Sequence, residues 1–141
     1  AVAQQGWLRT PHLQFVCANA LEYPLPESDA FILNDILHYM NYEHQRTLLL
    51  RCMEQLRPEG KLIVRDGNAA NTRKHRLTRF TELLSTGIFS FNKTTEELCF
   101  TSEAQIRSIA QEGGMQLEIL PNDRYTSNTI YIFQKNKPEH E

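Results

Sequence analysis

Two short apolar runs flank an amphipathic segment in the middle of the chain. The first run, Ala30–Leu33, has the length of a strand buried on both faces, as in parallel sheets. Tyr42–Leu56 then predicts a helix, and Arg57–Gly60 should end it, because the residue before a proline avoids helical geometry and glycine permits a turn. The second run, Lys61–Val64, follows directly. The apolar residues at helical spacing are Leu48, Leu49, Cys52, Met53 and Leu56. Strand, helix and strand in this order predict a right-handed crossover in a parallel sheet, and therefore an α/β fold.

The last third of the chain predicts one helix followed by two strands. Ser102 should cap the helix, because Gln105 follows three residues later as in a capping box, and Gly113-Gly114 should end it. Met115–Leu120 and Thr129–Phe133 are the predicted strands. They are too close in sequence for a helical crossover, so we expect them to pair antiparallel.

Three further elements are expected from local patterns. Ala1–Arg9 has the composition of the end of a helix, and Leu13–Cys17 has the pattern of a short strand. Arg73–Leu84 can form a helix with its leucines and Phe80 on one side.

Length and charge limit the classes of function. With 141 residues the chain is long enough for one domain only, and its net charge of -2 gives no support for binding to nucleic acid or to an anionic membrane. Its apolar runs fall far short of the roughly 20 residues of a membrane helix, and its first residues lack the pattern of a signal peptide. Cys17, Cys52 and Cys99 are widely spaced and are expected to be buried, reduced thiols of a cytoplasmic protein, with no metal site.

Polar clusters follow three of the predicted strands. They are Ala18–Leu21, Asn34–Tyr39 and Arg65–Gly67. Ligands of open parallel sheets bind just beyond the carboxyl ends of the strands. Because all three clusters lie at such ends, the sequence predicts a binding site along this rim.

The same residues resemble a known family. Phe15–Ala20, Leu25–Tyr39 and Leu56–Asp66 are similar in order and spacing to the middle of class I S-adenosylmethionine (SAM)-dependent methyltransferases, and the closing helix and strand pair agree. The resemblance covers nearly the whole chain. It implies a three-layer, Rossmann-like α/β domain that binds SAM and ends in an antiparallel strand pair.

The resemblance also implies roles for individual residues. Asn19 stands where the family usually has an Asp that accepts a hydrogen bond from the adenine amino group, and its amide oxygen can do the same. Ala20 and Leu21 would line the adenine. Asn34 and Asp35 would approach the methionine part of SAM, and Tyr39 would contact the cofactor or the substrate from the same turn.

His38 and Asp66 are the candidate catalytic residues. His38 follows a strand end, and an imidazole suits proton transfer near neutral pH. The alternative is a structural histidine, since methyl transfer can need no more than placement of the nucleophile. Asp35 could instead cap a helix, and Arg65 and Asp66 could form an ion pair with one another rather than anchor a substrate.

Parts of the family's pattern have no counterpart in the sequence. The chain has six glycines and no G-x-G motif, and the acidic residue that ends the family's second strand is missing. We therefore expect the C-terminal two-thirds of a methyltransferase domain, with residues 68–100 as its substrate lid. The edge of Phe31–Leu33 should then be open, to be covered by a preceding segment or by a second copy in a homo-oligomer.

The expected function is methyl transfer from SAM to an O, N or C nucleophile of a small molecule, once the missing N-terminal segment is supplied. The alternative from another class is a non-catalytic, methyltransferase-like module that binds a partner. Half of a nicotinamide-dependent oxidoreductase fits less well, because the closing antiparallel pair is foreign to it.

Overall fold

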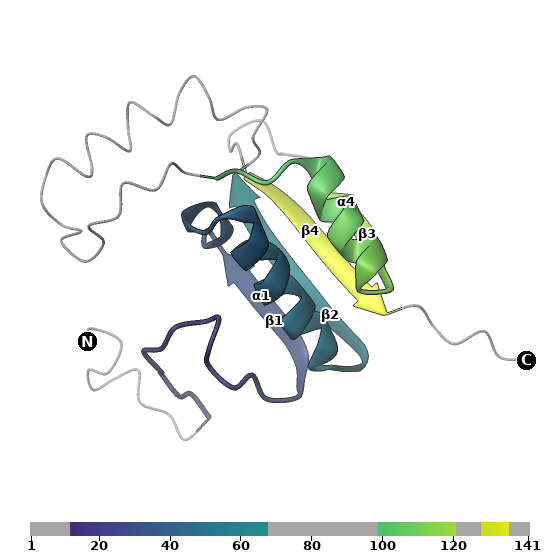
Figure 1. The fold of residues 1–141 in the computed structure, drawn as a ribbon. Helices are drawn as coiled ribbons and strands as arrows, with labels where there is room; N and C mark the ends of the chain where they lie inside the picture. The colour runs from purple at the N-terminus through teal and green to yellow at the C-terminus, as the bar shows by residue number, and fades with distance from the viewer. Residues whose placement is uncertain (1–11, 68–98, 121–127, 136–141) are drawn as a thin grey trace, which may run out of the picture.

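A computed structural model describes residues 12–67, 99–120 and 128–135. These form one four-stranded sheet in the order β1-β2-β4-β3, in which β1 and β2 are parallel and β4 is antiparallel to both of its neighbours (Figure 1). The elements in chain order are β1 (Ser28–Asn34), the 3-10 helix η3 (Leu37–Tyr39), α1 (Tyr42–Glu54), β2 (Leu56–Gly67), α4 (Glu103–Glu112), β3 (Met115–Leu120) and β4 (Asn128–Lys135). The predicted α/β fold with its parallel unit and closing antiparallel pair is confirmed.

The expected turn at Arg57–Gly60 takes a different form. These residues lie inside β2, where the pairing with β1 jumps from Ser28–Leu56 to Ala30–Lys61. Glu59 has a positive φ of 65° at this irregularity, and a Cβ on Gly60 would lie 3.0 Å from the Asp29 carbonyl oxygen. The proline and glycine therefore make a bulge at the start of β2 rather than a turn outside the strand.

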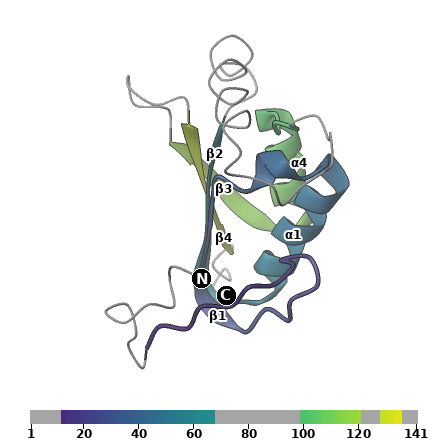
Figure 2. The same cartoon turned by 90° about the vertical axis from the view of Figure 1, so that its left-hand side faces the viewer.

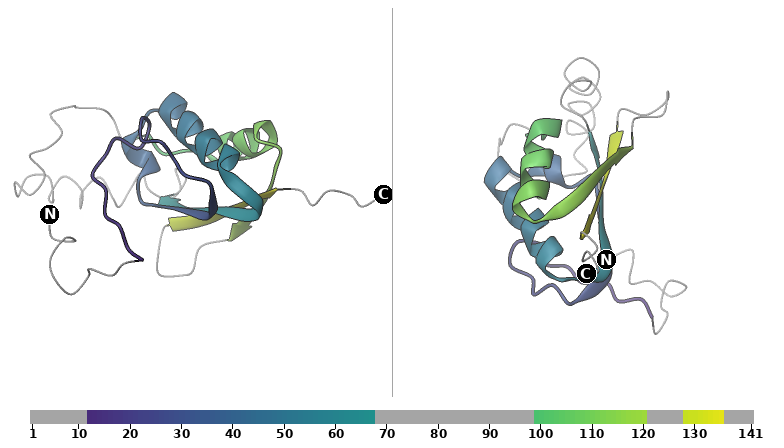
Figure 3. Two further views of the ribbon diagram at one scale, coloured as in Figure 1. Left: turned by 90° about the horizontal axis from the view of Figure 1, so that it is seen from below. Right: turned by 90° about the vertical axis from the view of Figure 1, so that its right-hand side faces the viewer.

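The two described α-helices, α1 and α4, cover the same face of the sheet (Figures 2 and 3). Between them and the strands lies one apolar core, to which α1, η3, α4 and the strands β2, β3 and β4 contribute buried side chains. Its largest fully buried side chains are Phe133, Leu37, Leu48, Leu49, Leu62, Ile106 and Ile109. The described residues thus form two of the three layers that the resemblance implied.

The other face of the sheet carries a row of isoleucines. Ile32 pairs with Ile63, and Ile63 pairs with Ile132, so the three side chains lie side by side across β1, β2 and β4. Ile32 is 70% exposed. The prediction that Ala30–Leu33 is buried on both faces is therefore wrong for the described part of the chain, since no described helix covers this side.

The three elements expected from local patterns have different outcomes. Leu13–Cys17 was expected to be a strand, but it has no regular structure and its side chains are exposed. A strand forms only where a neighbour can accept its hydrogen bonds, and no described strand lies beyond β1. Ala1–Arg9 and Arg73–Leu84 lie outside the described residues.

The three cysteines differ in their surroundings. Cys52 is buried as predicted, and burial raises the pKa of its thiol to about 11. Cys99 is half-buried and Cys17 is exposed, so the prediction of a buried thiol is wrong for Cys17, which belongs to the irregular segment before β1. Within the described ranges, no group of three His, Cys, Asp or Glu side chains could hold a metal ion. The same ranges contain no helix that is long and apolar enough to cross a membrane.

The predicted capping box of α4 is present. The Ser102 hydroxyl accepts from the Gln105 N–H at 3.3 Å, and the Ser102 N–H donates to the Gln105 side chain at 2.9 Å. Gly113 ends the helix, and Gly114 follows with a positive φ of 66°. Local sequence alone therefore sets both ends of this helix.

The cap gives a first testable prediction. Ser102→Ala should lower the free energy of unfolding by about 1 kcal/mol, because the Gln105 N–H loses its acceptor at the helix start. Ser108→Ala is the matched control, since Ser108 is an exposed serine inside the same helix. Urea unfolding of both variants measures the difference, and equal midpoints would contradict a stabilising role for the cap.

Candidate functional site

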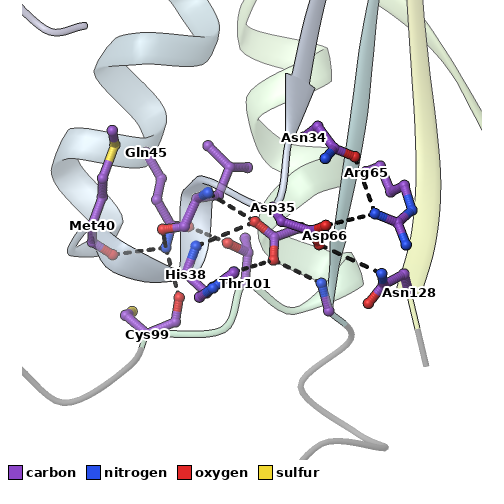
Figure 4. A network of polar contacts seen from close by, with 12 residues as sticks. Asn34, Asp35, His38, Met40, Gln45, Arg65, Asp66, Cys99, Thr101 and Asn128 are labelled. Atoms are coloured by element: carbon purple, nitrogen blue, oxygen red, sulfur yellow. Dashed lines mark hydrogen bonds and ion pairs between the residues drawn. The ribbon is translucent and has the colours of Figure 1, made fainter. Parts of the chain in front are cut away.

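The predicted rim forms where β1 and β2 end. Asn34 pairs with Arg65 in the parallel register, so the carboxyl ends of both strands meet at one edge of the sheet. Arg65–Gly67, predicted to follow a strand, are instead the last three residues of β2. Directly after β1, the chain turns at Asp35 and enters η3, which holds His38. The register thus brings His38 and Asp66, 28 residues apart in sequence, into contact (Figure 4).

His38 and Asp66 form a buried pair. His38 Nδ1 lies 2.6 Å from Asp66 Oδ1, and the two residues are 7% and 5% exposed. Asp66 Oδ2 also accepts from the backbone N–H groups of Leu37, at 2.8 Å, and His38, at 3.2 Å. Gly67 N–H donates to Oδ1 at 2.7 Å. These bonds are what stabilise a carboxylate away from water.

This contact defines which imidazole nitrogen can react. A neutral His38 that donates from Nδ1 to the Asp66 carboxylate carries its lone pair on Nε2. The ring is stacked against Phe100, with centroids 5.6 Å apart and planes at 20°, and it also contacts Tyr39 at 4.2 Å. Tyr39 itself is 53% exposed. The arrangement can therefore accept a proton at Nε2 while the carboxylate stabilises the resulting imidazolium.

Asp35 holds three strand ends together. Its carboxylate lies 2.5 Å from Arg65 Nη1 of β2 and accepts from Asn128 of β4 at 3.4 Å. Its N–H donates to the Arg65 carbonyl at 2.8 Å, and its φ of 53° makes the turn that leads into η3. Arg65 also donates to the Asn34 side chain at 3.1 Å.

Two alternatives considered for these residues are wrong. Asp35 does not cap η3: the capping position is Ile36, which makes no side-chain bond, while Asp66 binds the first N–H groups from the neighbouring strand. Arg65 does not pair with Asp66 but with Asp35. Adjacent residues of a strand point to opposite faces of the sheet, so Arg65 and Asp66 are directed apart.

The predicted adenine segment lies on a turn fixed to α1. Asn19 Oδ1 accepts from the Leu21 N–H at 3.1 Å, and its amide donates to Glu22 at 3.0 Å. Arg51 of α1 donates to the carbonyl oxygens of Ala20, at 2.9 Å, and of Leu21 and Tyr23. Asn19 is exposed, and its oxygen keeps a second lone pair for a ligand. No contact joins this turn to the His38–Asp66 pair among the hydrogen bonds of the described residues.

Sequence reasoning missed several residues that build the site. Gln45 is completely buried and contacts the chain on both sides of His38, and Thr101 and Phe100 reach the site from the segment before α4. One signal was present for Gln45: it precedes Leu48 and Leu49 by three and four residues, which places a polar side chain on the apolar face of the helix. No sequence signal indicates the tertiary partners of Arg51.

Comparison with solved structures shows methyltransferases of the same fold. An O-methyltransferase family protein from Burkholderia thailandensis aligns with 89% of this chain at 19% identity and a TM-score of 0.63. Human N-acetylserotonin methyltransferase, in complex with SAM, aligns with 96% at 18% identity and a TM-score of 0.66. Magnesium protoporphyrin IX methyltransferase from Synechocystis PCC 6803, with bound S-adenosylhomocysteine (SAH), aligns with 84% at 14% identity and a TM-score of 0.58.

The match covers only part of those proteins. This chain spans 36%, 37% and 49% of their respective lengths. Among curated proteins, no sequence matches it significantly. The model of one sequence family, the O-methyltransferase domain, matches residues 2–116, which is well over half of the chain. The chain therefore belongs to the O-methyltransferase domain family.

Proposed function

We propose that this chain carries the acid–base pair of a SAM-dependent O-methyltransferase that acts on a hydroxyl group of a small molecule. The observation that supports this most directly is the buried contact of 2.6 Å between His38 and Asp66 at the ends of two parallel strands. Such a pair matches the chemistry that a weakly acidic hydroxyl requires: a base at the attacking oxygen and a carboxylate that keeps the base in the right tautomer.

His38 would act through Nε2. The acceptor hydroxyl would donate to Nε2, and its proton would move to that nitrogen as the oxygen becomes nucleophilic. Asp66 would remain ionised and hold the imidazolium through Nδ1, as its present contact already allows. SAM supplies an electrophilic methyl group on a sulfonium. Tyr39, exposed beside the ring, would line the space in which cofactor and acceptor meet.

The residues present fit a part of the SAM molecule. Asn19 offers an exposed amide on a turn that Arg51 fixes through three backbone carbonyls, which suits contact with an adenine flanked by Ala20 and Leu21. Asn34 is exposed at the end of β1, next to Asp35, where polar atoms could bind the methionine group. Both side chains also bind the Arg65 guanidinium, so this edge offers a carboxylate that suits the ammonium group of the methionine part and a cation beside it.

We also propose that tight cofactor binding needs a Gly-rich segment that this sequence does not contain. The edge of β1, which pairs with no other described strand than β2, and the exposed Ile32 support packing of such a segment there. Calorimetric titration of SAH into this chain, and into the chain extended upstream along its reading frame, tests the idea. We expect binding by the extended form and none by the 141-residue chain.

The other outcomes decide between the candidate functions. Equal binding by both forms would show that residues 1–141 suffice and would remove the need for a further segment. Binding by neither form would contradict the enzyme and favour a non-catalytic module that binds a partner. If the extended form binds SAH, the acceptor is sought by screening small-molecule hydroxyl compounds for transfer of a labelled methyl group.

A further inference from the structure

We propose that Gln45 is the positioning residue of His38: one buried amide that fixes the backbone on both sides of the imidazole and holds Phe100 against its ring. The proposal rests on the function proposed for His38, but its structural part can be tested without any activity. Gln45 lies in the first half of α1 and is buried on the same helix as the core residues Leu48 and Leu49.

The side chain of Gln45 joins two separate stretches of backbone to α1: the η3 stretch and the segment before α4. Its Nε2 lies 3.0 Å from the Leu37 carbonyl oxygen, 2.9 Å from that of Met40 and 2.7 Å from that of Cys99 (Figure 4). Its Oε1 accepts from the Thr101 hydroxyl. Two amide protons serve three carbonyls, so one proton is shared between two acceptors. The residue is fully buried, so no water can replace these bonds.

Two of the carbonyl groups that Gln45 binds lie on either side of His38 in the chain. Leu37 precedes it and Met40 follows two residues later, so Gln45 fixes both ends of η3. From the opposite side, Asp66 binds the N–H groups of Leu37 and His38. The His38 carbonyl accepts from the Cys99 N–H at 3.1 Å. The backbone that carries the imidazole is thus held by α1, by β2 and by the segment before α4.

Gln45 also helps to attach that last segment, together with the bond from the Cys99 N–H to the His38 carbonyl. Cys99 and Thr101 both bond to the Gln45 amide, and Phe100 between them stacks on the imidazole. Loss of the amide would therefore release two constraints on His38 at once: the carbonyls of η3 and the aromatic ring on its face. The remaining bonds of Asp66 would still hold Nδ1, so the effect is on orientation and not on the existence of the pair.

The first test uses amide hydrogen exchange of the 141-residue chain. Gln45→Met keeps the volume of the side chain but removes both donors. We expect the amides of Leu37, His38 and Cys99 to exchange at least tenfold faster than in the unmodified chain, beyond any change in β2 and β4. Leu48→Ala is the matched control, because Leu48 is buried on the same helix but has no part in this network. Leu48→Ala should raise the exchange rates of Leu37, His38 and Cys99 and those of β2 and β4 by similar factors.

A second pair of variants keeps the test decisive if Gln45→Met does not fold. Thr101→Val removes the hydroxyl that orients the amide, while Thr101→Ser keeps a hydroxyl at the same position. We expect faster exchange at Cys99 in the valine variant and rescue in the serine variant. Two results would overturn the proposal. One is a folded Gln45→Met variant in which Leu37, His38 and Cys99 exchange no faster relative to β2 and β4. The other is a Thr101→Val variant in which Cys99 exchanges no faster relative to the same strands.

Kinetics then separates positioning from binding. In a form of the protein that transfers methyl groups, Gln45→Met should lower kcat roughly 10- to 100-fold and leave SAH affinity within twofold, since a misplaced base slows chemistry without touching the cofactor. If the unmodified enzyme transfers no methyl group, the function proposed for His38 fails, while the exchange results still decide the role of Gln45.

Discussion

Replacement of His38 by Gln should lower kcat for methyl transfer by roughly 100- to 10 000-fold, the range that a general base contributes. Glutamine fills a similar space and can still hydrogen-bond, but it cannot accept a proton from the acceptor hydroxyl. The bond of 2.6 Å to Asp66 would be replaced by an amide contact without acid–base chemistry. Transfer of a labelled methyl group, measured at saturating SAM in a form of the protein that binds it, gives the rate.

A matched control lies a few residues further along the chain. His44 is exposed on α1; its backbone N–H donates to the Asn41 side chain, and its imidazole has no hydrogen-bond partner among the described residues. His44→Gln should keep kcat within twofold, and SAH affinity should be unchanged in both variants. A rate for His38→Gln within about threefold of the unmodified enzyme would show that placement of the acceptor is enough and that His38 is structural.

Replacement of Asp66 by Asn should have a large effect on stability as well as on activity. The carboxylate accepts from the His38 ring and from three backbone N–H groups, on Leu37, His38 and Gly67. An amide turns one of its two oxygens into a donor, so buried donors then face each other. Each unsatisfied buried group costs about 1–3 kcal/mol, which predicts a loss of about 3 kcal/mol in the free energy of unfolding.

The same change should also lower kcat, because the imidazole is no longer kept in the tautomer that leaves Nε2 unprotonated. Asp29→Asn is the control: this aspartate lies 3.4 Å from Arg57 with 83% of its side chain exposed. The unfolding free energy of Asp29→Asn should stay within about 0.5 kcal/mol of that of the unmodified chain. Denaturant unfolding, followed by circular dichroism, compares the two, and equal losses would refute the role of Asp66.

The elements that local patterns define were predictable. The capping box of Ser102 and Gln105 depends on residues within one helical turn, and the alternation of α1 with its flanking strands depends on apolar spacing. Leu13–Cys17 failed for the converse reason: its apolar pattern suits a strand, but a strand also needs a neighbour, and no local pattern reports one.

The candidate site divides in the same way. The position of His38 after one strand and of Asp66 near the carboxyl end of another was visible in the sequence, as was their membership of one rim. Their direct contact depends on the register of β1 against β2, which pairs Asn34 with Arg65. A shift of one residue would have turned Asp66 to the other face of the sheet. Gln45 was overlooked because polar residues of a helix are assumed to face solvent, whereas two of its partners come from 54 and 56 positions later in the chain.

Among the described strands β1 lies at an edge of the sheet, which has a consequence for how the 141-residue chain behaves in concentrated solution. An edge strand without a cover is a template for adding strands from other molecules, and proteins usually block it with lysine or proline. From Ala30 to Asn34 the strand has neither, and Asp29 is the only charged residue in β1. With Ile32 exposed on the uncovered face, this short apolar stretch has the composition of an aggregation-prone segment. Yield and shelf life of the purified chain would therefore be limited by self-association at this strand well before the limit set by unfolding of the core.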